Sequence, residues 1–236
     1  MSAANAVRTG LRGLGQTLIT FGVIVLLFCF YELQITNIVA ARSQDRLGDQ
    51  LARSWAASRP TVPAAATGPA AAPAPSAPLP GDALARIYAP SLAGYEPRVV
   101  VEGVSVADLK EGGPGHIPGT AVPGAIGNVV LSGHRTTYGA PFNRWDELGP
   151  GAEVVVETRD SWFTYTVTGS QIVLPTAVEV TLPVPGKPGA TPTERLLTMT
   201  TCNPEYSAAQ RLIVSATLTA TDRKSDGLPA ALQAGA

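Results

Sequence analysis

The sequence predicts an all-β domain, either a small β-barrel or a β-sandwich, preceded by one N-terminal transmembrane helix. Three observations support this prediction. An apolar run occupies residues 14–33, a run rich in proline and alanine follows, and short β-type runs separated by glycine and proline turns fill the rest of the chain. No amphipathic helices of about 12 residues separate these runs, which excludes a doubly wound α/β fold.

The composition excludes several classes of protein. The chain has 236 residues, a formal net charge of −1, two cysteines and two histidines. Without an excess of basic residues it has no electrostatic means of binding nucleic acid, so no nucleic-acid partner is expected. Two cysteines cannot form a disulfide-rich scaffold, and the cysteines and histidines together leave few ligands for zinc. We therefore expect no cofactor and no metal.

Residues 14–33 are expected to form the transmembrane helix. The run carries no charge before Glu32, and about 20 apolar residues span a hydrocarbon core of ~30 Å. A cleaved signal peptide is the competing interpretation. Phe30 and Tyr31, which follow the apolar run, match a small-residue cleavage site poorly and therefore favour an uncleaved anchor.

The charges that flank this helix predict its orientation. Arg8 and Arg12 precede it, and Glu32 lies at its other end. The positive-inside rule then makes residues 1–13 a cytoplasmic tail and places the rest of the chain outside the cell. The protein is thus expected to be a single-pass protein of the cytoplasmic membrane, with an extracytoplasmic domain.

Residues 34–81 are expected to form a juxtamembrane helix and a linker. Ile35, Ile38, Leu47 and Leu51 recur at spacings near three and four, which predicts an amphipathic helix, with an irregular stalk as the alternative. Seven prolines then fall between residues 60 and 80, in a mostly alanine context. This composition favours a polyproline II spacer that could extend the domain away from the membrane by up to roughly 60 Å.

Residues 82–222 are expected to form the folded domain, and residues 223–236 a flexible tail. Val, Thr, Ile and aromatic residues are frequent in seven predicted strands: 85–88, 98–104, 128–132, 153–158, 162–173, 195–200 and 211–220. Arg159 and Asp160 form the turn of a predicted hairpin. The only helical pattern in this part of the sequence lies at residues 142–148.

Cys202 is the first candidate for chemistry, because it is the only cysteine outside the predicted membrane span. It ends a predicted strand just before Asn203 and Pro204, and Arg211 opens the next strand nine residues later. Consecutive antiparallel strands would place Cys202 and Arg211 side by side. A buried, inert thiol is the alternative interpretation.

His134 is the preferred partner for this thiol. It follows the predicted strand 128–132 and Gly133, whereas His116 lies in a loop rich in glycine and proline and is expected to be structural or to lie at the rim of a groove. A thiolate, an imidazole and a guanidinium together would form an acyl-transfer site. Arg135 is expected to be a structural or groove-rim charge. Asp146 and Glu147 could orient His134 but are expected to be surface or capping groups. Glu102, Asp108 and Glu111 could bind calcium, but the sequence has no oxygen-ligand loop of the EF-hand kind, so no calcium site is expected.

Four sequence segments resemble the sortase family. Residues 198–202 (TMTTC) resemble the sortase T-L-x-T-C motif, with Met199 in place of leucine, and residues 211–214 (RLIV) resemble the strand that carries the family's arginine. Residues 131–142 (LSGHRTTYGAPF) and 113–120 (GPGHIPGT) resemble class E sortases of actinobacteria. The resemblance extends over about residues 86–219.

This resemblance implies a closed eight-stranded sortase-type barrel with short helices and a membrane-anchored cysteine transpeptidase. Such an enzyme cleaves an LAXTG-type sorting signal between Thr and Gly through a cysteine thioester. It then transfers the protein to an amine of a peptidoglycan precursor or of a pilin. By this resemblance Cys202 is the nucleophile, His134 the general acid and base, and Arg211 the stabiliser of the oxyanion. Thr200, Thr201 and Tyr138 would bind the substrate.

Two other functions are compatible with such a barrel. It could bind sorting peptides without cleaving them, or it could be a structural protein of the cell envelope. Neither function requires a free thiol outside the cell, so the presence of Cys202, His134 and Arg211 together favours the enzyme.

Overall fold

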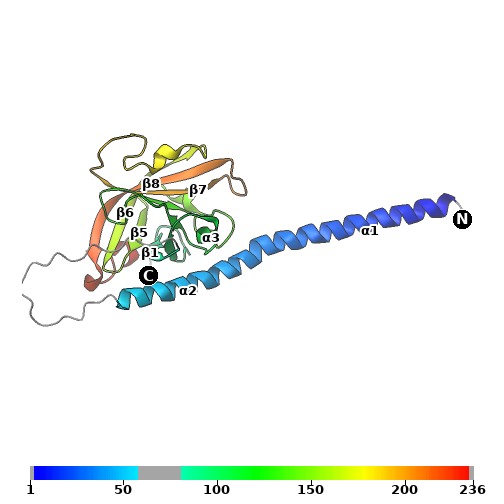
Figure 1. Ribbon diagram of the computed structural model, residues 1–236, viewed down its shortest axis with the longest axis horizontal. Coiled ribbons are helices and arrows are strands. Elements are labelled where there is room, and N and C mark those ends of the chain that lie inside the picture. Colours follow the sequence, from blue (N-terminus) through cyan, green and yellow to red (C-terminus); the bar gives the residue numbers. More distant parts are fainter. Residues whose placement is uncertain (1–2, 58–80, 234–236) are drawn as a thin grey trace, which may run out of the picture.

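A computed structural model describes residues 3–57 and 81–233 of the chain. Figure 1 shows two parts, a long helical rod and a β-barrel that rests against one end of the rod. The predicted polyproline linker, residues 60–80, lies outside the described residues, and its conformation stays a prediction.

The rod consists of two α-helices joined without a break. Helix α1 (Ala3–Phe30) continues through a π-helical segment, η1 (Tyr31–Ile35), into helix α2 (Thr36–Ala57). Among the described residues, one helical stretch, Arg8–Phe30, is long and apolar enough to span a membrane. Helix α2 lies where the sequence predicted an amphipathic helix, and the alternative of an irregular stalk is wrong.

Eight strands close into a barrel in the order β1-β2-β3-β4-β7-β8-β6-β5. The pairs β2–β3 and β4–β7 are parallel, and the other neighbours are antiparallel. This closure confirms the all-β, eight-stranded barrel and excludes the sandwich. The strands are β1 (Ala83–Tyr88), β2 (Arg98–Glu102), β3 (Gly115–His116), β4 (Gly127–Ser132), β5 (Glu153–Glu157), β6 (Ser161–Val173), β7 (Arg195–Asn203) and β8 (Gln210–Arg223).

The strand missing from the seven predicted by residue pattern is β3. It has only two residues and lies among glycines and prolines, so it carries no β-type pattern of its own. Its two residues nevertheless bridge β2 and β4. Short helices connect the strands, as expected: α3 (Val106–Leu109), η2 (Trp145–Glu147) and η3 (Val178–Thr181).

The C-terminal residues contain two more short helices where the sequence predicted only a flexible tail. These are η4 (Lys224–Asp226) and α4 (Ala230–Gln233). Ala231 of α4 packs against Val155 and Trp162 on the outside of the barrel. An alanine-rich segment of four residues has little helical tendency of its own, so this tertiary contact provides its stability.

The barrel interior is apolar, and the residues buried in it identify which side chains of each strand face inward and which face outward. Leu131 on β4, Met199 on β7 and Val214 on β8 all belong to the same buried cluster. Successive side chains of a strand point to opposite faces. Val130, Thr200 and Ile213 therefore belong to the outer face of these three strands.

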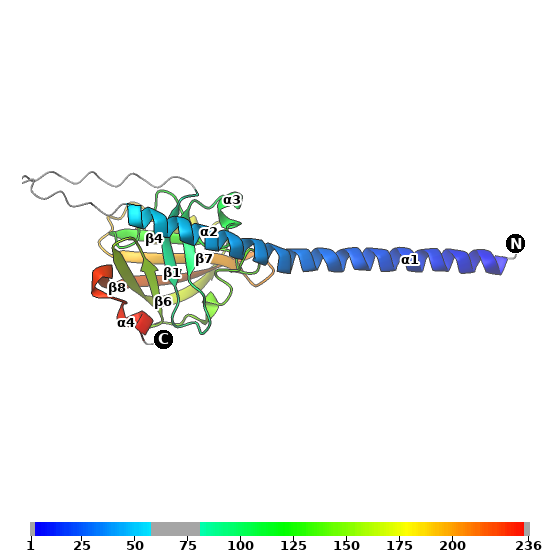
Figure 2. The same cartoon turned by 90° about the horizontal axis from the view of Figure 1, so that it is seen from below.

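Helix α2 packs along the outer face of β1 and β2, as Figure 2 shows. Leu47 and Leu51 form an apolar cluster with Val99 and Val101. Gln44 is buried in the same contact, where its amide oxygen accepts a hydrogen bond of 2.7 Å from the Val99 N–H. The helix is therefore packed as part of the folded domain.

Candidate active site

Cys202 lies near the end of β7, directly opposite Arg211 on β8. Residues that are directly opposite in an antiparallel pair project to the same face of the sheet. Because Met199 faces the interior, Cys202 and Arg211 face outward. The Cys202 thiol is half-buried and free, and the other cysteine, Cys29, lies in helix α1.

His134 reaches the same end of the barrel through the parallel pairing of β4 with β7. Ser132 lies opposite Thr200 in this pair. His134 comes two residues after Ser132, and Cys202 comes two residues after Thr200. Both residues therefore lie at the same end of the β4–β7 pair. Beyond the last paired residues, the Gly133 N–H still donates a hydrogen bond of 3.1 Å to the Thr200 carbonyl.

The surroundings of His134 favour its neutral form. Partial burial lowers the pKa of the imidazole below its usual value, and the nearby Lys110 ammonium lowers it further. The Tyr138 ring lies 5.1 Å from the imidazole, centroid to centroid. A neutral imidazole at physiological pH can accept a proton from a thiol.

Tyr138 is held in an uncommon backbone conformation. Its φ is 52°, that of Ala140 is 41°, and both lie in the left-handed region that side chains disfavour. The Lys110 ammonium lies 5.6 Å from the centroid of the Tyr138 ring. Tyr138, predicted to bind substrate, therefore lies close to both His134 and Lys110. The sequence did not indicate that Lys110 belongs to this site, because Lys110 lies in the segment between β2 and β3, far from His134 in the sequence.

Arg211 is anchored at the turn between β7 and β8. Its Nη1 donates hydrogen bonds of 2.9 Å to the carbonyls of Ala208 and Gln210. Both bonds use one nitrogen, so, as far as residues 3–57 and 81–233 show, Nε and Nη2 keep their N–H groups for another acceptor. Arg211 thus lies opposite Cys202 in the strand pair, with its guanidinium bonded to the turn.

The two neighbouring threonines lie on opposite faces of β7. Thr200 is half-buried on the outer face with Cys202. Thr201 is only 4% exposed, and its hydroxyl donates a hydrogen bond of 2.8 Å to the Gly133 carbonyl. The structure thus places Thr200 beside the thiol and Thr201 in the barrel wall. Substrate binding by either residue stays a prediction.

Arg135 is buried and links the histidine loop to the cysteine strand. It is 6% exposed, and its Nη1 donates to the Asn203 amide oxygen at 2.7 Å and to the Cys202 carbonyl at 3.4 Å. Its Nη2 forms an ion pair of 3.0 Å with Asp146. Asp146 therefore balances the charge of Arg135, and this pairing supports the expectation that it does not orient His134.

His116 has a structural environment, as expected. It is 2% exposed, with Nδ1 2.7 Å from Glu102 Oε2 and Nε2 2.9 Å from the Ala121 carbonyl.

The other two carboxylates considered for calcium also form contacts elsewhere. Asp108 closes a capping box at the start of α3, and Glu111 pairs with Arg46.

The chain is similar to known sortases. A family model described as "Sortase domain" matches residues 87–219. Sortase SrtE1 of Streptomyces coelicolor is 34% identical over 228 residues, which cover 94% of this chain and 60% of that protein. Sortase SrtE2 of the same organism is 31% identical over 220 residues, which cover 89% of this chain and 82% of that protein.

Structural similarity leads to the same family. A crystal structure of sortase E1 from Streptomyces coelicolor with a tripeptide in the active site is 36% identical, with a TM-score of 0.60. The match covers 66% of this chain and 99% of the other. A family match over residues 87–219 and a relative covered over 82% of its length show that this protein belongs to the sortase family, whose members are cysteine transpeptidases.

Proposed function

We propose that this protein is a membrane-anchored class E sortase that cleaves an LAXTG-type sorting signal between Thr and Gly. One observation carries the proposal. The registers of β4 with β7 and of β7 with β8 bring His134, Cys202 and Arg211 to one end of the barrel. The similarity to class E sortases supports the choice of substrate class.

The first half of the reaction forms a thioester. His134 accepts the proton of the Cys202 thiol, and the resulting thiolate attacks the carbonyl carbon of the substrate threonine. When the Thr–Gly C–N bond breaks, the His134 imidazolium donates its proton to the leaving glycine nitrogen. The threonine carbonyl is then bonded to the Cys202 sulfur, and the fragment that begins with glycine departs.

The second half transfers the acyl group to an amine. The amine nitrogen attacks the thioester carbon and loses a proton to His134. The C–S bond breaks, and the Cys202 thiolate recovers its proton from His134. In both halves a negative charge develops on the carbonyl oxygen, and the Nε and Nη2 donors of Arg211, which the two turn carbonyls do not use, would stabilise it.

We also propose the partners and the location. Arg8 and Arg12 lie in the first turns of the apolar Arg8–Phe30 stretch, which favours a cytoplasmic N-terminus and an extracytoplasmic barrel. The donors are then proteins that carry LAXTG-type signals. The acceptor is an amine of a peptidoglycan precursor or of a pilin.

The test uses the full-length protein in detergent micelles. It is incubated with a peptide that contains Leu-Ala-x-Thr-Gly and with hydroxylamine as the amine, and the products are identified by mass. We expect a hydroxamate at the threonine and a thioester adduct on the protein. Cys202→Ala should abolish both, whereas the matched control Cys29→Ala should retain them.

The same experiment separates the alternatives. Peptide that binds the protein but emerges intact would indicate a binding module. A protein that neither binds nor cleaves the peptide would indicate a structural role. Cleavage that persists in Cys202→Ala would assign the nucleophile to another residue.

A further inference from the structure

One face of helix α2 contacts the loops that surround His134. Asn37, Ala40 and Gln44 are spaced by three and four residues, so they lie on one side of the helix. The Asn37 amide oxygen accepts a hydrogen bond of 2.9 Å from the Gly139 N–H. The Gln44 amide nitrogen donates to the Glu111 carbonyl at 3.0 Å.

Ala40 lies against Gly112, and this contact leaves no space for a side chain. A Cβ atom added to Gly112 would lie 2.7 Å from the Ala40 Cβ. A Cβ added to Gly139 would lie 3.1 Å from the Gly112 carbonyl oxygen and 3.6 Å from the Ala40 Cβ. The helix therefore packs closely on Gly112, where a Cβ has no room, and Gly139 is tightly packed with a φ of 77° that favours glycine.

These two loop segments carry the groups that define the surroundings of His134. Lys110, two residues before Gly112, lies over the Tyr138 ring, and Tyr138 lies against His134. Tyr138 and Ala140, on either side of Gly139, have left-handed backbone angles. Residues in such conformations keep them only when neighbouring contacts hold them in place. The Asn37–Gly139 hydrogen bond is a contact at the middle of this strained segment.

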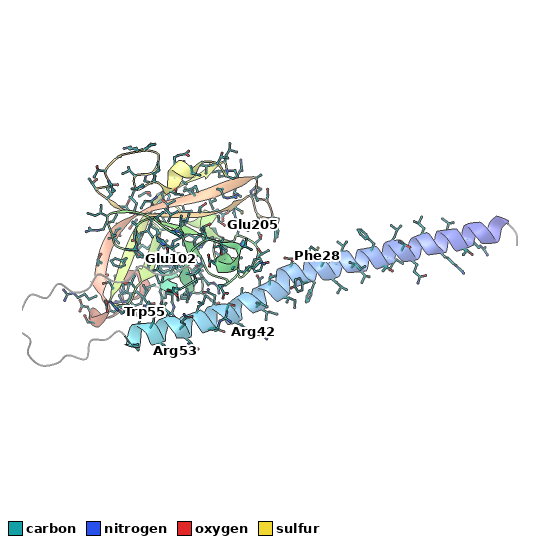
Figure 3. All side chains as sticks on the ribbon, in the orientation of Figure 1. Phe28, Arg42, Arg53, Trp55, Glu102 and Glu205 are labelled. Carbon is teal, nitrogen blue, oxygen red and sulfur yellow. The ribbon has the colours of Figure 1, made fainter. Side chains whose placement is uncertain are left out.

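The position of α2 connects this packing to the apolar helix. Asn37 lies seven residues beyond Phe30, about 10 Å along a helix. At the other end of α2, the Trp55 ring lies 4.2 Å from the Lys224 ammonium, which follows the far end of β8. In Figure 3, Glu205, on the turn after β7, lies on the side of the barrel towards Phe28, and Trp55 lies at the opposite side. The active-site end of the barrel thus faces α1.

We propose that α2 is a positioning element of the active site and that Asn37 is its positioning residue. By holding the Gly139 N–H, Asn37 keeps Tyr138 packed against His134 and the Lys110 segment in place behind it. This proposal rests on the proposed function, because the geometry that it fixes is that of the transpeptidase site. It makes helix α2 part of the catalytic apparatus as well as the link between the barrel and the apolar helix α1.

The test compares two substitutions of Asn37 in the full-length protein in lipid nanodiscs. Asn37→Ala removes the hydrogen-bond acceptor, whereas Asn37→Asp keeps an oxygen in the same place. Arg42→Ala is the matched control, because Arg42 is exposed on the same helix. We measure kcat/KM for the LAXTG-type peptide and, separately, hydrogen exchange of the backbone amides of residues 138–140.

We expect Asn37→Ala to lower kcat/KM about 3- to 10-fold, the effect of losing one hydrogen bond that the site requires. Exchange at Gly139 should accelerate by a similar factor. Asn37→Asp should restore both values to within about twofold, and Arg42→Ala should change neither.

Two results would overturn the proposal. One is an Asn37→Ala variant that equals the parent in kcat/KM and in Gly139 exchange. The other is an equal loss of activity in the Ala and Asp variants with Gly139 exchange unchanged. If the parent protein cleaves no peptide, the proposed function fails, and the exchange measurement still decides whether Asn37 holds the Tyr138 segment.

Discussion

The Thr201 hydroxyl donates a hydrogen bond of 2.8 Å to the Gly133 carbonyl, so the residue before the thiol is bonded to the residue before the imidazole. This bond extends the pairing of β4 and β7 beyond the last paired residues of the ladder. Both groups are buried, where a hydrogen bond is hard to replace by water. The relative position of Cys202 and His134 therefore depends on the pairing of β4 with β7 and on the Thr201–Gly133 hydrogen bond that extends it.

Thr201→Val should reduce stability more than its neighbour's substitution does. Valine matches the shape of threonine but leaves the buried Gly133 carbonyl without this donor, which costs about 1–2 kcal/mol in the free energy of unfolding. Thr200→Val, on the outer face, should change stability by less than about 0.5 kcal/mol and should instead weaken peptide binding. Urea unfolding and steady-state kinetics of both variants measure the contrast. If Thr200→Val lost stability and Thr201→Val weakened peptide binding instead, Thr200 would be the structural residue and Thr201 the substrate-binding one.

Arg211→Lys should lose most of the transpeptidase activity. Lysine cannot bond two turn carbonyls through one nitrogen and also offer a planar pair of donors to the substrate. Loss of an oxyanion donor lowers turnover by about 100-fold. Arg223→Lys, at the other end of the same strand, is the control for kcat. An Arg211→Lys enzyme as fast as the parent would remove the guanidinium from the mechanism.

Lys110→Gln should raise the pKa of His134. Burial and the Lys110 charge both lower it, so the parent imidazole should titrate below 6.5 and the variant closer to that value. NMR of the imidazole protons across pH 4–8 (about the range in which histidine titrates) measures both midpoints, with the exposed Lys187→Gln as control. An unchanged midpoint in Lys110→Gln would show that burial alone sets the pKa.

The lowered pKa also predicts the sign of a stability change. The folded state binds fewer protons at His134 than the unfolded state, whose pKa is near 6.5. The contribution of this group to stability is therefore fully present above the unfolded-state pKa and is lost as the pH falls from there through the lower pKa of the folded state. Lys110→Gln should flatten this dependence in chemical unfolding measured at pH 5 and pH 7.5.

Asp146→Asn should have a small effect on catalysis. Asp146 is 51% exposed and pairs with Arg135, so its charge supports a buried guanidinium. A carboxylate that orients a catalytic histidine is worth about 10⁴-fold in turnover, whereas we expect less than a threefold loss here. Glu147→Gln, which removes the neighbouring carboxylate, is the control. A loss above 100-fold in Asp146→Asn would make Asp146 a partner of His134.

The sequence was sufficient to predict most strands of this barrel, because their residue patterns are local. β6 and β8 carry long runs of β-branched and aromatic residues, and the β5–β6 hairpin turns at Arg159 and Asp160. The two-residue strand β3 could not be found in this way, since only its position between β2 and β4 makes it a strand.

The part of the candidate site that lies on consecutive strands could be predicted from the sequence. Cys202 and Arg211 flank one turn, so antiparallel pairing alone places them opposite each other. Lys110 and Asn37 could not be predicted, because each reaches the histidine loop from an element far away in the sequence. Asn37 also lies on a helix whose pattern indicates an apolar face but not the surface that it packs against.

The unbroken path from α1 through η1 into α2 has a consequence for where the proposed reaction takes place. In the proposed membrane arrangement, the tilt of α1 and the tilt of the active-site end of the barrel change together, because α2 is packed on the barrel. A bilayer thinner or thicker than α1 requires changes the inclination of a transmembrane helix. Lipid composition would then alter the height of the nucleophile above the headgroups, and with it which substrates can reach the sulfur.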